Sequence, residues 1–384
     1  MLPRLAMNAI RVGATLVLTG GVACGSLSAP DGGTNRTIWR VDGKGWGTPT
    51  FDAATAYFVG SSHDLIAVDK ATGAMRWRST TSDPGASTNG TSAVIVGDVV
   101  AMGDLDIYGF DRQTGARRWL FHPSDGYYPG LFFLTTDGAT IFAGSPSGRA
   151  YAIDGRTGSV TWTGVIATDN NTSVFNPVLA NGQVFVCVKH FTTPVMTGGL
   201  VALNAITGAV QWSFEFAPPG GQGGCNRSPA VIGGLVVGAS QDGHIYALNQ
   251  QSGTLAWTAP QLSNLPAGTG GSPMMDDRPL VAAGSLVIVG STTGYVVALD
   301  GGTGLERWRA TANRGSIAAP IAADDAHVFV THLGLQLAEF DLASGALNWV
   351  AGDNAQGGEF YPSPAVDIDR VFVGGVHGLY ALRK

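Results

Sequence analysis

Histidine and cysteine are the residue types in this sequence that could hold a metal ion or act as nucleophiles. Among the seven His residues, His327 and His332 have a spacing within the range of zinc ligands. The apolar run between them, residues 328–331, is typical of a strand, in which an odd separation places the two rings on opposite faces. We therefore predict no metal site. The chain also contains no G-x-S-x-G, Walker A or C-x-x-C motif, so no catalytic residue or cofactor-binding residue is predicted from such motifs.

Cys24 stands at the end of a segment with the features of an export signal. Residues 1–11 carry Arg4 and Arg11 and no acid, and residues 12–23 are an apolar stretch. This stretch is shorter than the ~20 residues that span a bilayer, but it suits a secretory signal. A small-residue end followed by Cys resembles bacterial lipoproteins, with Gly21 as a departure. We predict a signal peptide over residues 1–23, lipidation at Cys24 and a linker over residues 24–34. Simple secretion, with cleavage around residues 26–29, is the alternative.

Cys187 and Cys225 are the two remaining cysteines. Cys187 lies within the apolar run QVFVCVK, and Cys225 lies in a Gly-rich segment. An exported compartment permits a disulfide bond, but sequence alone cannot bring two Cα atoms within bridging distance. We expect two unpaired thiols, one of them buried as a small apolar side chain; a disulfide is the alternative.

Composition narrows the fold and the partners. Gly accounts for 56 of 384 residues, and charged residues for only 13%. Abundant Gly with few charges favours many short strands and tight turns over a helical bundle. The net charge is −6, and no dense cluster of Lys and Arg occurs, so nucleic acid is not a predicted partner.

Tryptophan marks a repeated unit, because eight of the nine Trp residues recur at intervals of 38 to 51 residues. Seven of the eight end one pattern, in which an Asp or Asn lies eight residues before the Trp and a Gly lies four before it. Asp69, Gly73 and Trp77 form the first copy. The repeated residues are Trp39, Trp77, Trp119, Trp162, Trp212, Trp257, Trp308 and Trp349.

Each part of the repeat has a mechanical role. The Asp or Asn side chain can accept from backbone N–H groups two or three residues on, and the Gly supplies a positive φ at the end of the turn. Two alternating segments flank this turn, and two more precede them, the first often beginning with Pro as in Ser228–Pro229. Because Pro lacks a ladder donor, that first strand is an edge. We predict blades of four antiparallel strands with the first strand innermost, as in a β-propeller.

Counting the units predicts an all-β, eight-bladed propeller over residues 35–384. Seven units are complete, and an eighth runs from Tyr361 to Lys384 without its own turn or Trp. Residues 35–40 contain Trp39 without a preceding blade. We therefore expect the N-terminal strand to complete the last blade, which closes the ring and removes its open edges.

The repeat A-[LV]-[DN]-x-x-[TS]-G-x-x-x-W resembles that of the pyrroloquinoline quinone-type propeller family. This family includes quinoprotein alcohol dehydrogenases and BamB-type outer-membrane lipoproteins. The resemblance covers residues 35–384 and implies that the repeated Trp residues pack against neighbouring blades as scaffold. The repeat is structural, so it does not by itself assign a function.

The face that carries the longer connections is the expected binding face. Residues just before each inner strand should point toward the central funnel, where a few polar and aromatic groups could form a concave site. The alternative is that these groups bond only to one another and to water. The candidates are Trp46, Asn89, Tyr128, Asn176, Arg227, Arg314, Glu359 and Tyr361, with Lys44, Tyr127 and Asn226 beside them.

Two functions are compatible with these features. The first is a non-enzymatic, exported binding protein of BamB type, expected to be a monomer and to be anchored by lipid in the periplasm or outer membrane. It would bind a protein partner, and it would need no cofactor. The second is an alcohol or sugar dehydrogenase that binds pyrroloquinoline quinone with calcium. The resemblance implies long covering loops and, in many such enzymes, an adjacent Cys-Cys pair. The chain has no such pair, so we favour the first function.

Overall fold

The repeat turn folds as its spacing predicts. Asp69 Oδ1 accepts hydrogen bonds from the backbone N–H groups of Ala71 and Thr72, at 3.1 and 2.9 Å, and from the Thr72 hydroxyl at 2.9 Å. Gly73 follows with φ +75°, a conformation that costs glycine little. The glycines at the same position of the other six copies have φ between 69° and 74°. One local turn therefore occurs seven times.

The structure is a computed structural model. It describes residues 36–43, 45, 47–60, 63–81, 92–123, 133–169, 171–191, 196–216, 223–225, 227–240, 243–259, 280–291, 293–312, 317, 321–332, 336–352, 364–375 and 378–384. These residues contain no helix, and so none that could cross a membrane.

The strands form eight sheets of four antiparallel strands each. Their bounds, from the innermost to the outermost strand of blades 1 to 4, are β2 (Thr50–Phe51), β3 (Thr55–Gly60), β4 (Asp64–Asp69) and β5 (Met75–Thr80); β6 (Ala93–Val96), β7 (Val99–Gly103), β8 (Ile107–Asp111) and β9 (Arg117–Phe121); β10 (Leu134–Thr136), β11 (Thr140–Gly144), β12 (Arg149–Asp154) and β13 (Val160–Val165); β14 (Thr172–Ala180), β15 (Gln183–His190), β16 (Thr197–Asn204) and β17 (Val210–Glu215).

The strands of blades 5 to 8 follow in the same order. They are β18 (Ala230–Ile232), β19 (Leu235–Ala239), β20 (Ile245–Asn249) and β21 (Leu255–Ala259); β22 (Leu280–Ala283), β23 (Leu286–Gly290), β24 (Tyr295–Asp300) and β25 (Glu306–Thr311); β26 (Ala322–Ala323), β27 (His327–His332), β28 (Gln336–Asp341) and β29 (Leu347–Ala351); β30 (Ala365–Val366), β31 (Arg370–Gly374), β32 (Leu379–Arg383) and β1 (Thr37–Val41).

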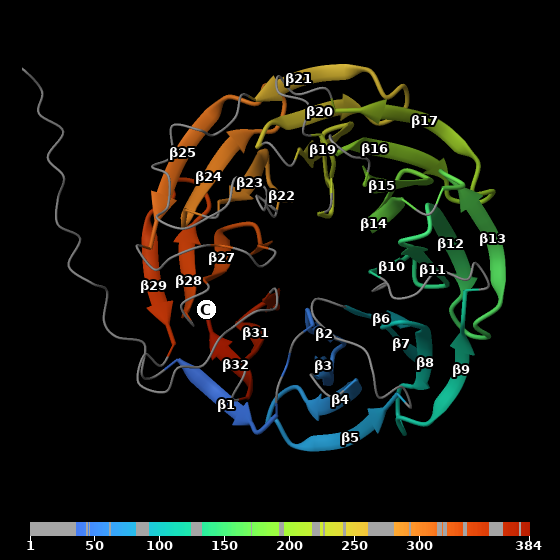
Figure 1. Ribbon diagram of the computed structural model, residues 1–384. Helices are drawn as coiled ribbons and strands as arrows, with labels where there is room; N and C mark the ends of the chain where they lie inside the picture. Colours follow the sequence, from blue (N-terminus) through green and yellow to red (C-terminus); the bar gives the residue numbers. More distant parts are fainter. Residues whose placement is uncertain are drawn as a thin grey trace, which may run out of the picture.

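The blades form a closed ring (Figure 1). Its last sheet has the order β1-β32-β31-β30, so the first strand of the chain is the outer strand of the eighth blade. β1 pairs antiparallel with β32, and Trp39 lies opposite Ala381. The predicted eight-bladed propeller and its closure by the N-terminal strand are both confirmed.

The repeated Trp residues join neighbouring blades. Trp77 of blade 1 donates from Nε1 to the backbone carbonyl of Arg112, which follows the turn Asp of blade 2, at 3.1 Å. Its ring lies against Gly115 of the same turn, where a Cβ atom would come within 2.7 Å of the ring. The turn glycine is therefore required both for its positive φ and for the close approach of the Trp ring.

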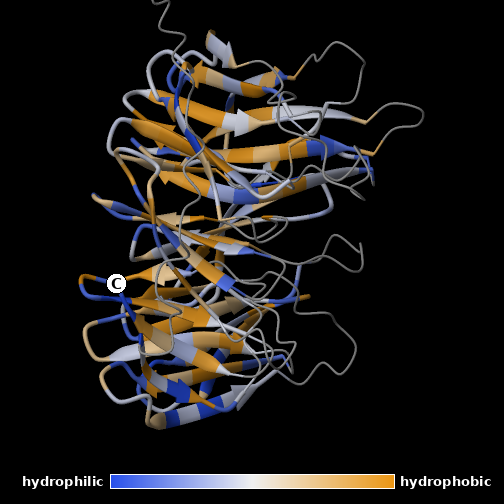
Figure 2. Cartoon of the chain, turned by 90° about the vertical axis from the view of Figure 1, so that its left-hand side faces the viewer, coloured by the Kyte–Doolittle hydropathy of each residue, from blue (hydrophilic) through white to orange (hydrophobic). Residues whose placement is uncertain are grey.

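The core is divided among the seams between blades. Eight clusters of buried apolar side chains each join two adjacent blades. At the closing seam, Trp39 packs with Phe58 of blade 1 and Phe372 of blade 8. Figure 2 shows the resulting distribution, with hydrophobic residues concentrated along the strands. The closing seam therefore buries a layer of apolar side chains, as every other seam does.

Candidate functional site

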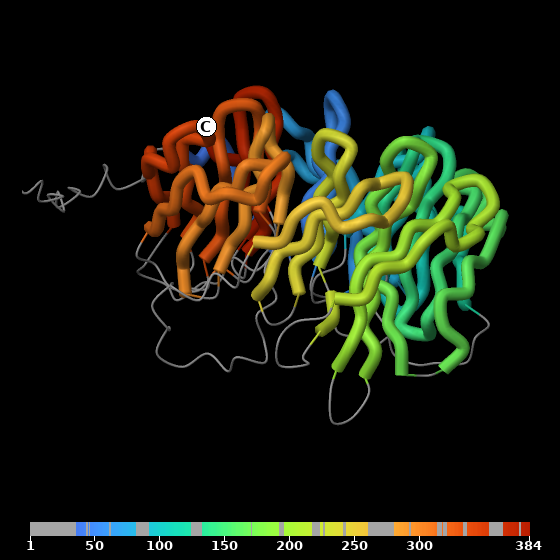
Figure 3. Tube along the Cα trace, turned by 90° about the horizontal axis from the view of Figure 1, so that it is seen from above, coloured from blue at the N-terminus to red at the C-terminus, as the bar shows by residue number. Residues whose placement is uncertain are grey.

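Antiparallel connectivity places the loops of every blade on two opposite faces. The turns after the first and third strands lie on one face, which we call the turn face (Figure 3). The loops after the second strands and the links between blades belong to the other, the connector face. The turn that joins β4 to β5 spans only residues 70–74, whereas residues 260–279 link β21 to β22. The longer connections thus belong to one face.

Two of the eight candidate funnel residues, Asn176 and Arg227, belong to the described part of the chain. The predictions for Trp46, Asn89, Tyr128, Arg314, Glu359, Tyr361 and for Cys24 concern residues outside the described ones.

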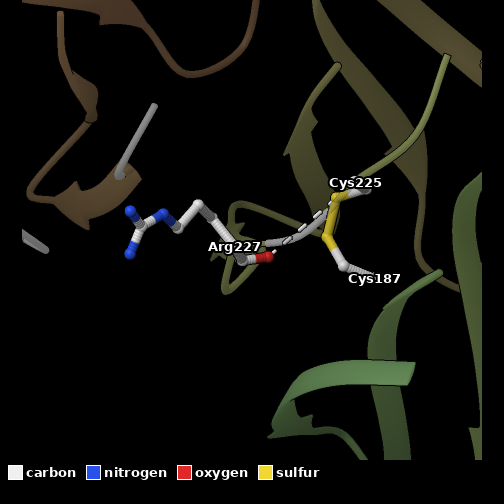
Figure 4. Close-up of a disulfide and its surroundings, with 3 residues drawn as sticks. All are labelled: Cys187, Cys225 and Arg227. Atoms are coloured by element: carbon white, nitrogen blue, oxygen red, sulfur yellow. Dashed lines mark hydrogen bonds between the residues drawn. A yellow bond between two sulfur atoms is a disulfide. The ribbon is translucent and has the colours of Figure 1, made fainter. Parts of the chain in front are cut away.

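Arg227 lies where the chain enters blade 5, two residues after Cys225. Its side chain extends away from the disulfide, on the other side of its own backbone (Figure 4). Its carbonyl oxygen lies 3.9 Å from Cys225 Sγ. The residue is half-buried. The disulfide thus lies beside the Arg227 backbone, and the guanidinium group, which is a planar set of donors, lies away from it.

The expectation of two unpaired thiols is wrong, because Cys187 of β15 and Cys225 form a disulfide with Cα atoms 4.9 Å apart. The segment around Cys225 folds back onto blade 4. The N–H of Cys225 donates to the Val188 carbonyl at 3.2 Å, and the N–H of Gly223 donates to the Met196 carbonyl at 2.8 Å. The segment that leads from blade 4 to blade 5 thus folds back onto blade 4 and brings the two cysteines together. No residue spacing in the sequence predicts this path.

Asn176 departs from its predicted position. Asn176 is predicted to lie just before an inner strand, but Asn176 and Pro177 both lie within β14, at a register shift between Phe175 and Val178. Pro lacks an N–H group, so it fits a bulge that skips a ladder bond. Asn176 is 6% exposed, has φ +34°, and its Oδ1 has no hydrogen-bond partner among the described residues. Strain and an unpaired buried oxygen make it a candidate for function.

The structure also brings together two histidine–aspartate pairs that the sequence analysis did not predict. His63 Nδ1 lies 2.7 Å from Asp104 Oδ2 of the next blade, and His122 Nδ1 lies 2.7 Å from Asp106 Oδ1. Asp104 is fully buried, and His63 has φ +54°. The sequence does contain a signal for these pairs: Asp104 and Asp106 lie in a loop whose equivalent in blade 3, from Ser145 to Gly148, has no charged residue. A loop whose residues differ from those of the other repeats is a place to look for a functional site.

These histidines and carboxylates form separate pairs and do not meet at one metal site. Among the residues that the structure describes, no group of three His, Cys, Asp or Glu side chains is arranged to hold a metal ion. His327 and His332 lie at opposite ends of β27, and His332 is fully buried.

Strongly lowered carboxyl pKa values belong to the turns. Hydrogen bonds from Arg76 and Thr72 lower the pKa of Asp69 to about 2, and those from Arg307 and Thr303 lower that of Asp300 to about 2. Perturbed pKa values mark functional sites only in part, because structural ion pairs produce them too. Here they accompany turn formation, and they do not point to acid–base catalysis.

The chain matches the family model of the outer membrane protein assembly factor BamB over residues 23–191, 177–285 and 273–384. It is 26% identical over 308 residues to BamB of Bordetella pertussis, which covers 77% of this chain and 73% of that protein. It is also 26% identical over 178 residues to BamB of Yersinia pestis. That alignment covers 46% of this chain and 42% of the Yersinia protein, less than half of each.

Other similarities concern the fold or a part of the chain. The crystal structure of BamB from Moraxella catarrhalis superposes with a TM-score of 0.60 and 21% identity, covering 75% of this chain and 82% of that one. The dehydrogenase subunit of the quinone alcohol dehydrogenase of Komagataeibacter europaeus is 33% identical over 122 residues. These residues cover 28% of this chain and 16% of the subunit.

Proposed function

The chain belongs to the family of the outer membrane protein assembly factor BamB, and on that premise we propose that it is an exported, non-enzymatic propeller that binds proteins during outer-membrane assembly. The observation that carries this proposal is the match of the family model, which begins at residue 23 and ends at residue 384. The Bordetella relative, which aligns with most of the chain, supports it. The predicted signal and Cys24 would place the protein in the periplasm, anchored to the outer membrane.

The connector face is the proposed binding surface. It carries the longer links, and Arg227 extends from one of them. Arg offers a planar fork of donors that matches carboxylates and is enriched at binding hot spots. Arg227 and Arg314 precede the inner strands of blades 5 and 7, so together they could contact one acidic partner group. No cofactor is required for this role.

Capture from outer membranes tests the proposal. The mature chain would be crosslinked in membranes of its source organism, and the captured proteins identified by mass spectrometry. We expect outer-membrane assembly proteins with the natural chain and few with Arg227→Ala/Arg314→Ala. Arg156→Ala, an exposed arginine of the turn face, is the matched control and should behave like the natural chain. Melting temperatures equal to that of the natural chain would show that both variants fold. Capture unrelated to outer-membrane assembly would refute the role.

A quinone dehydrogenase is the second candidate, favoured by the local match to a dehydrogenase subunit. The residues present do not fit the cofactor that this class uses. The adjacent cysteine pair expected beneath the quinone is missing, and the two described cysteines instead bridge residues 38 positions apart. Reconstitution with pyrroloquinoline quinone and calcium separates the two functions: dye-linked alcohol oxidation with tight quinone absorbance would replace the binding role by an enzymatic one.

A further inference from the structure

A cavity of about 550 Å³ lies between blades 6 and 7 on the turn face. It is lined by the first turn of each of these blades, which joins the innermost strand to the second, by the repeat turn of blade 7 and by Arg307 of β25. Its volume is in the range of small-ligand pockets, roughly 300–1,000 Å³. We call it the seam cavity. Because the turn face is opposite the connector face (Figure 3), this cavity is separate from the proposed binding surface.

In other seams a long polar side chain crosses from blade to blade at this place. Lys70 follows the turn Asp of blade 1. Its Nζ lies 2.6 Å from Asp367 Oδ2 of blade 8 and donates to the Asp52 carbonyl, 3.1 Å away. Arg112 has the same position in blade 2, where its Nε lies 3.6 Å from Asp52 Oδ2 of blade 1 and its Nη1 donates to the Gly97 carbonyl at 2.9 Å. Each side chain thus joins the first turns of two blades.

Two more seams contain such a bridge. Gln250 of blade 5 accepts a hydrogen bond from Asn181 of blade 4 at 2.7 Å. Lys384 follows β32 as Lys70 follows β4, and its Nζ lies 2.6 Å from Asp324 Oδ2 of blade 7. Three of these four bridges are cations on an aliphatic stem. The ring itself therefore shows which chemistry this part of a seam accommodates.

The seam cavity lacks a bridge of this kind, because in blade 7 the position of Lys70 is occupied by Leu342. A seam without a polar bridge can instead be filled from the preceding blade. In blade 3 the residue at this position is Gly155, where an added Cβ atom would collide with the Val96 side chain of blade 2. The equivalent of Val96 in blade 6, the last residue of the innermost strand, is Ala283. The small Ala283 and the apolar Leu342 therefore leave space that no cation crosses.

Two carboxylates of blade 7, Asp325 and Asp341, line this space. In blades 1, 2 and 6 the turn Asp pairs with an arginine directly before the repeated Trp. In blade 7 that position is Asn348, which donates to Glu339 instead. Arg307 also lines the cavity, but it pairs with Asp300 of its own blade at 2.7 Å. The seam cavity therefore carries more negative charge than positive.

We propose that the seam cavity binds the side chain of a lysine or arginine that projects from a partner polypeptide. The aliphatic stem would lie on Leu286 and Leu342, and the charged group would meet Asp325 and Asp341. Long basic side chains bind in this way, with the stem on apolar surface and the charge at a polar rim. Lys70 provides the example within this chain, with its Nζ 4.8 Å from the centre of the Phe51 ring.

Arg307 and the size of the cavity favour a polypeptide over a free amine as the source of the cation. The bond to Asp300 uses only one nitrogen of Arg307, and a guanidinium group has five N–H donors. The others can donate to main-chain carbonyls beside the bound side chain, which a free amine does not have. The site is thus a second binding surface, and it does not depend on the proposed function.

Substitutions that the repeats themselves contain test this site. Asp325→Asn/Asp341→Asn removes both carboxylates, and the repeat turn tolerates Asn because Asn204 and Asn249 occupy this position in blades 4 and 5. Asp137→Asn/Asp154→Asn makes the same change of charge in the turns of blade 3 and is the matched control. Leu342→Lys supplies an internal bridge as Lys70 does, and Leu342→Met is its uncharged control.

The probes are the blocked peptide acetyl-Ser-Gly-Lys-Gly-Ser-amide, its arginine and glutamine analogues, and 1,5-diaminopentane. Each is titrated into the full mature chain labelled with ¹³C in the leucine methyl groups. The signals of Leu286 and Leu342 report on the cavity, and leucine signals of the other blades are the internal control. Leu286 alone reports in the Leu342 variants. Melting temperatures show that each variant is folded.

We expect the lysine and arginine peptides to shift the signals of Leu286 and Leu342 and the glutamine peptide to leave them unchanged. Binding should be at least tenfold weaker in Asp325→Asn/Asp341→Asn, unchanged in the blade 3 control, abolished in Leu342→Lys and retained in Leu342→Met. No shift with the lysine peptide, equal shifts with the glutamine peptide, or unchanged affinity in the folded Asp325→Asn/Asp341→Asn variant would overturn the inference. Tighter binding of 1,5-diaminopentane than of the lysine peptide would overturn the assignment to a polypeptide.

Discussion

The indole nitrogen of Trp39 donates a hydrogen bond to the backbone carbonyl of Lys70, 3.1 Å away. Six other repeated Trp residues make the same contact with the next blade, over 2.7 to 3.1 Å. Trp349 is the exception. Its Nε1 has no acceptor among the described residues, and the Arg36 guanidinium lies 4.6 Å from the centre of its ring. Thus the seam between blades 7 and 8 lacks the hydrogen bond that the others share.

This difference predicts unequal effects of one substitution. Trp39→Phe loses a hydrogen bond that Trp349→Phe does not lose, while both lose similar apolar area. We expect Trp39→Phe to lower the free energy of unfolding by about 1 kcal/mol more than Trp349→Phe, since a net hydrogen bond contributes ~0.5–1.5 kcal/mol. Guanidinium-induced unfolding, followed by circular dichroism, measures both. Equal losses would show that the indole bond to Lys70 adds nothing.

Deleting residues 37–41 removes the closing strand. It exposes an edge of β32 and removes Trp39 from the core, and loss of a large buried aromatic side chain alone costs ~3–5 kcal/mol. We expect a lower melting temperature and aggregation, seen by scanning fluorimetry and size-exclusion chromatography. Deleting residues 25–29 instead is the control and should change neither. A closing-strand deletion that stays monomeric and melts normally would contradict closure by β1.

Removal of the disulfide should destabilise the protein. The bridge closes a loop with a sequence separation of 38, for which chain entropy gives about 3–4 kcal/mol. We expect Cys187→Ala/Cys225→Ala to lose an amount of this order in chemical unfolding, and the natural chain to lose it on reduction while the double variant does not respond. Mass spectrometry after alkylation of the denatured, unreduced chain should find both residues unmodified; two alkylated thiols would refute the bridge.

The ion pair of Asp324 with Lys384 predicts a pH dependence of stability. Burial by itself would raise the pKa of Asp324, but hydrogen bonds from Lys384, 2.6 Å away, and from the N–H groups of Ala326 and His327 lower it to about 2. Because the folded value lies below the ordinary value of 3.8, the pair stabilises the protein fully above about pH 4 and loses its effect as the pH falls toward 2.

Asp324→Asn tests this dependence. The stability difference between the natural chain and Asp324→Asn should be largest above pH 4 and should shrink toward pH 2, as measured by urea unfolding at each pH. Asp325→Asn changes the exposed neighbour and is the control. A difference that stays constant across this range would mean that Asp324 does not act through its charge.

Lipidation at Cys24 has a direct test. Cys24→Ser should abolish incorporation of labelled fatty acid and move the protein from the membrane fraction to the soluble exported fraction. Ser26→Ala, two residues away, should keep both. An unmodified mature chain that begins after Cys24, found by intact mass, would instead establish simple secretion.

The blades, their number and their closure follow from the repeat in the amino-acid sequence. The reason is that the repeat turn is local: the backbone N–H and C=O groups that bond to Asp69 in the turn lie within five residues of it. A spacing of residues therefore predicts the turn, and the turn predicts the two strands that it joins. The count of turns and the leftover Trp39 then require that β1 complete the last blade.

The contacts between loops are visible only in the folded protein. The pairing of Cys187 with Cys225, the contact of His63 with Asp104 across 41 positions and the place of Asn176 in a bulge all depend on segments that fold back or cross a seam. Contacts between distant segments depend on the path of the whole backbone, and that path is not encoded in any local spacing.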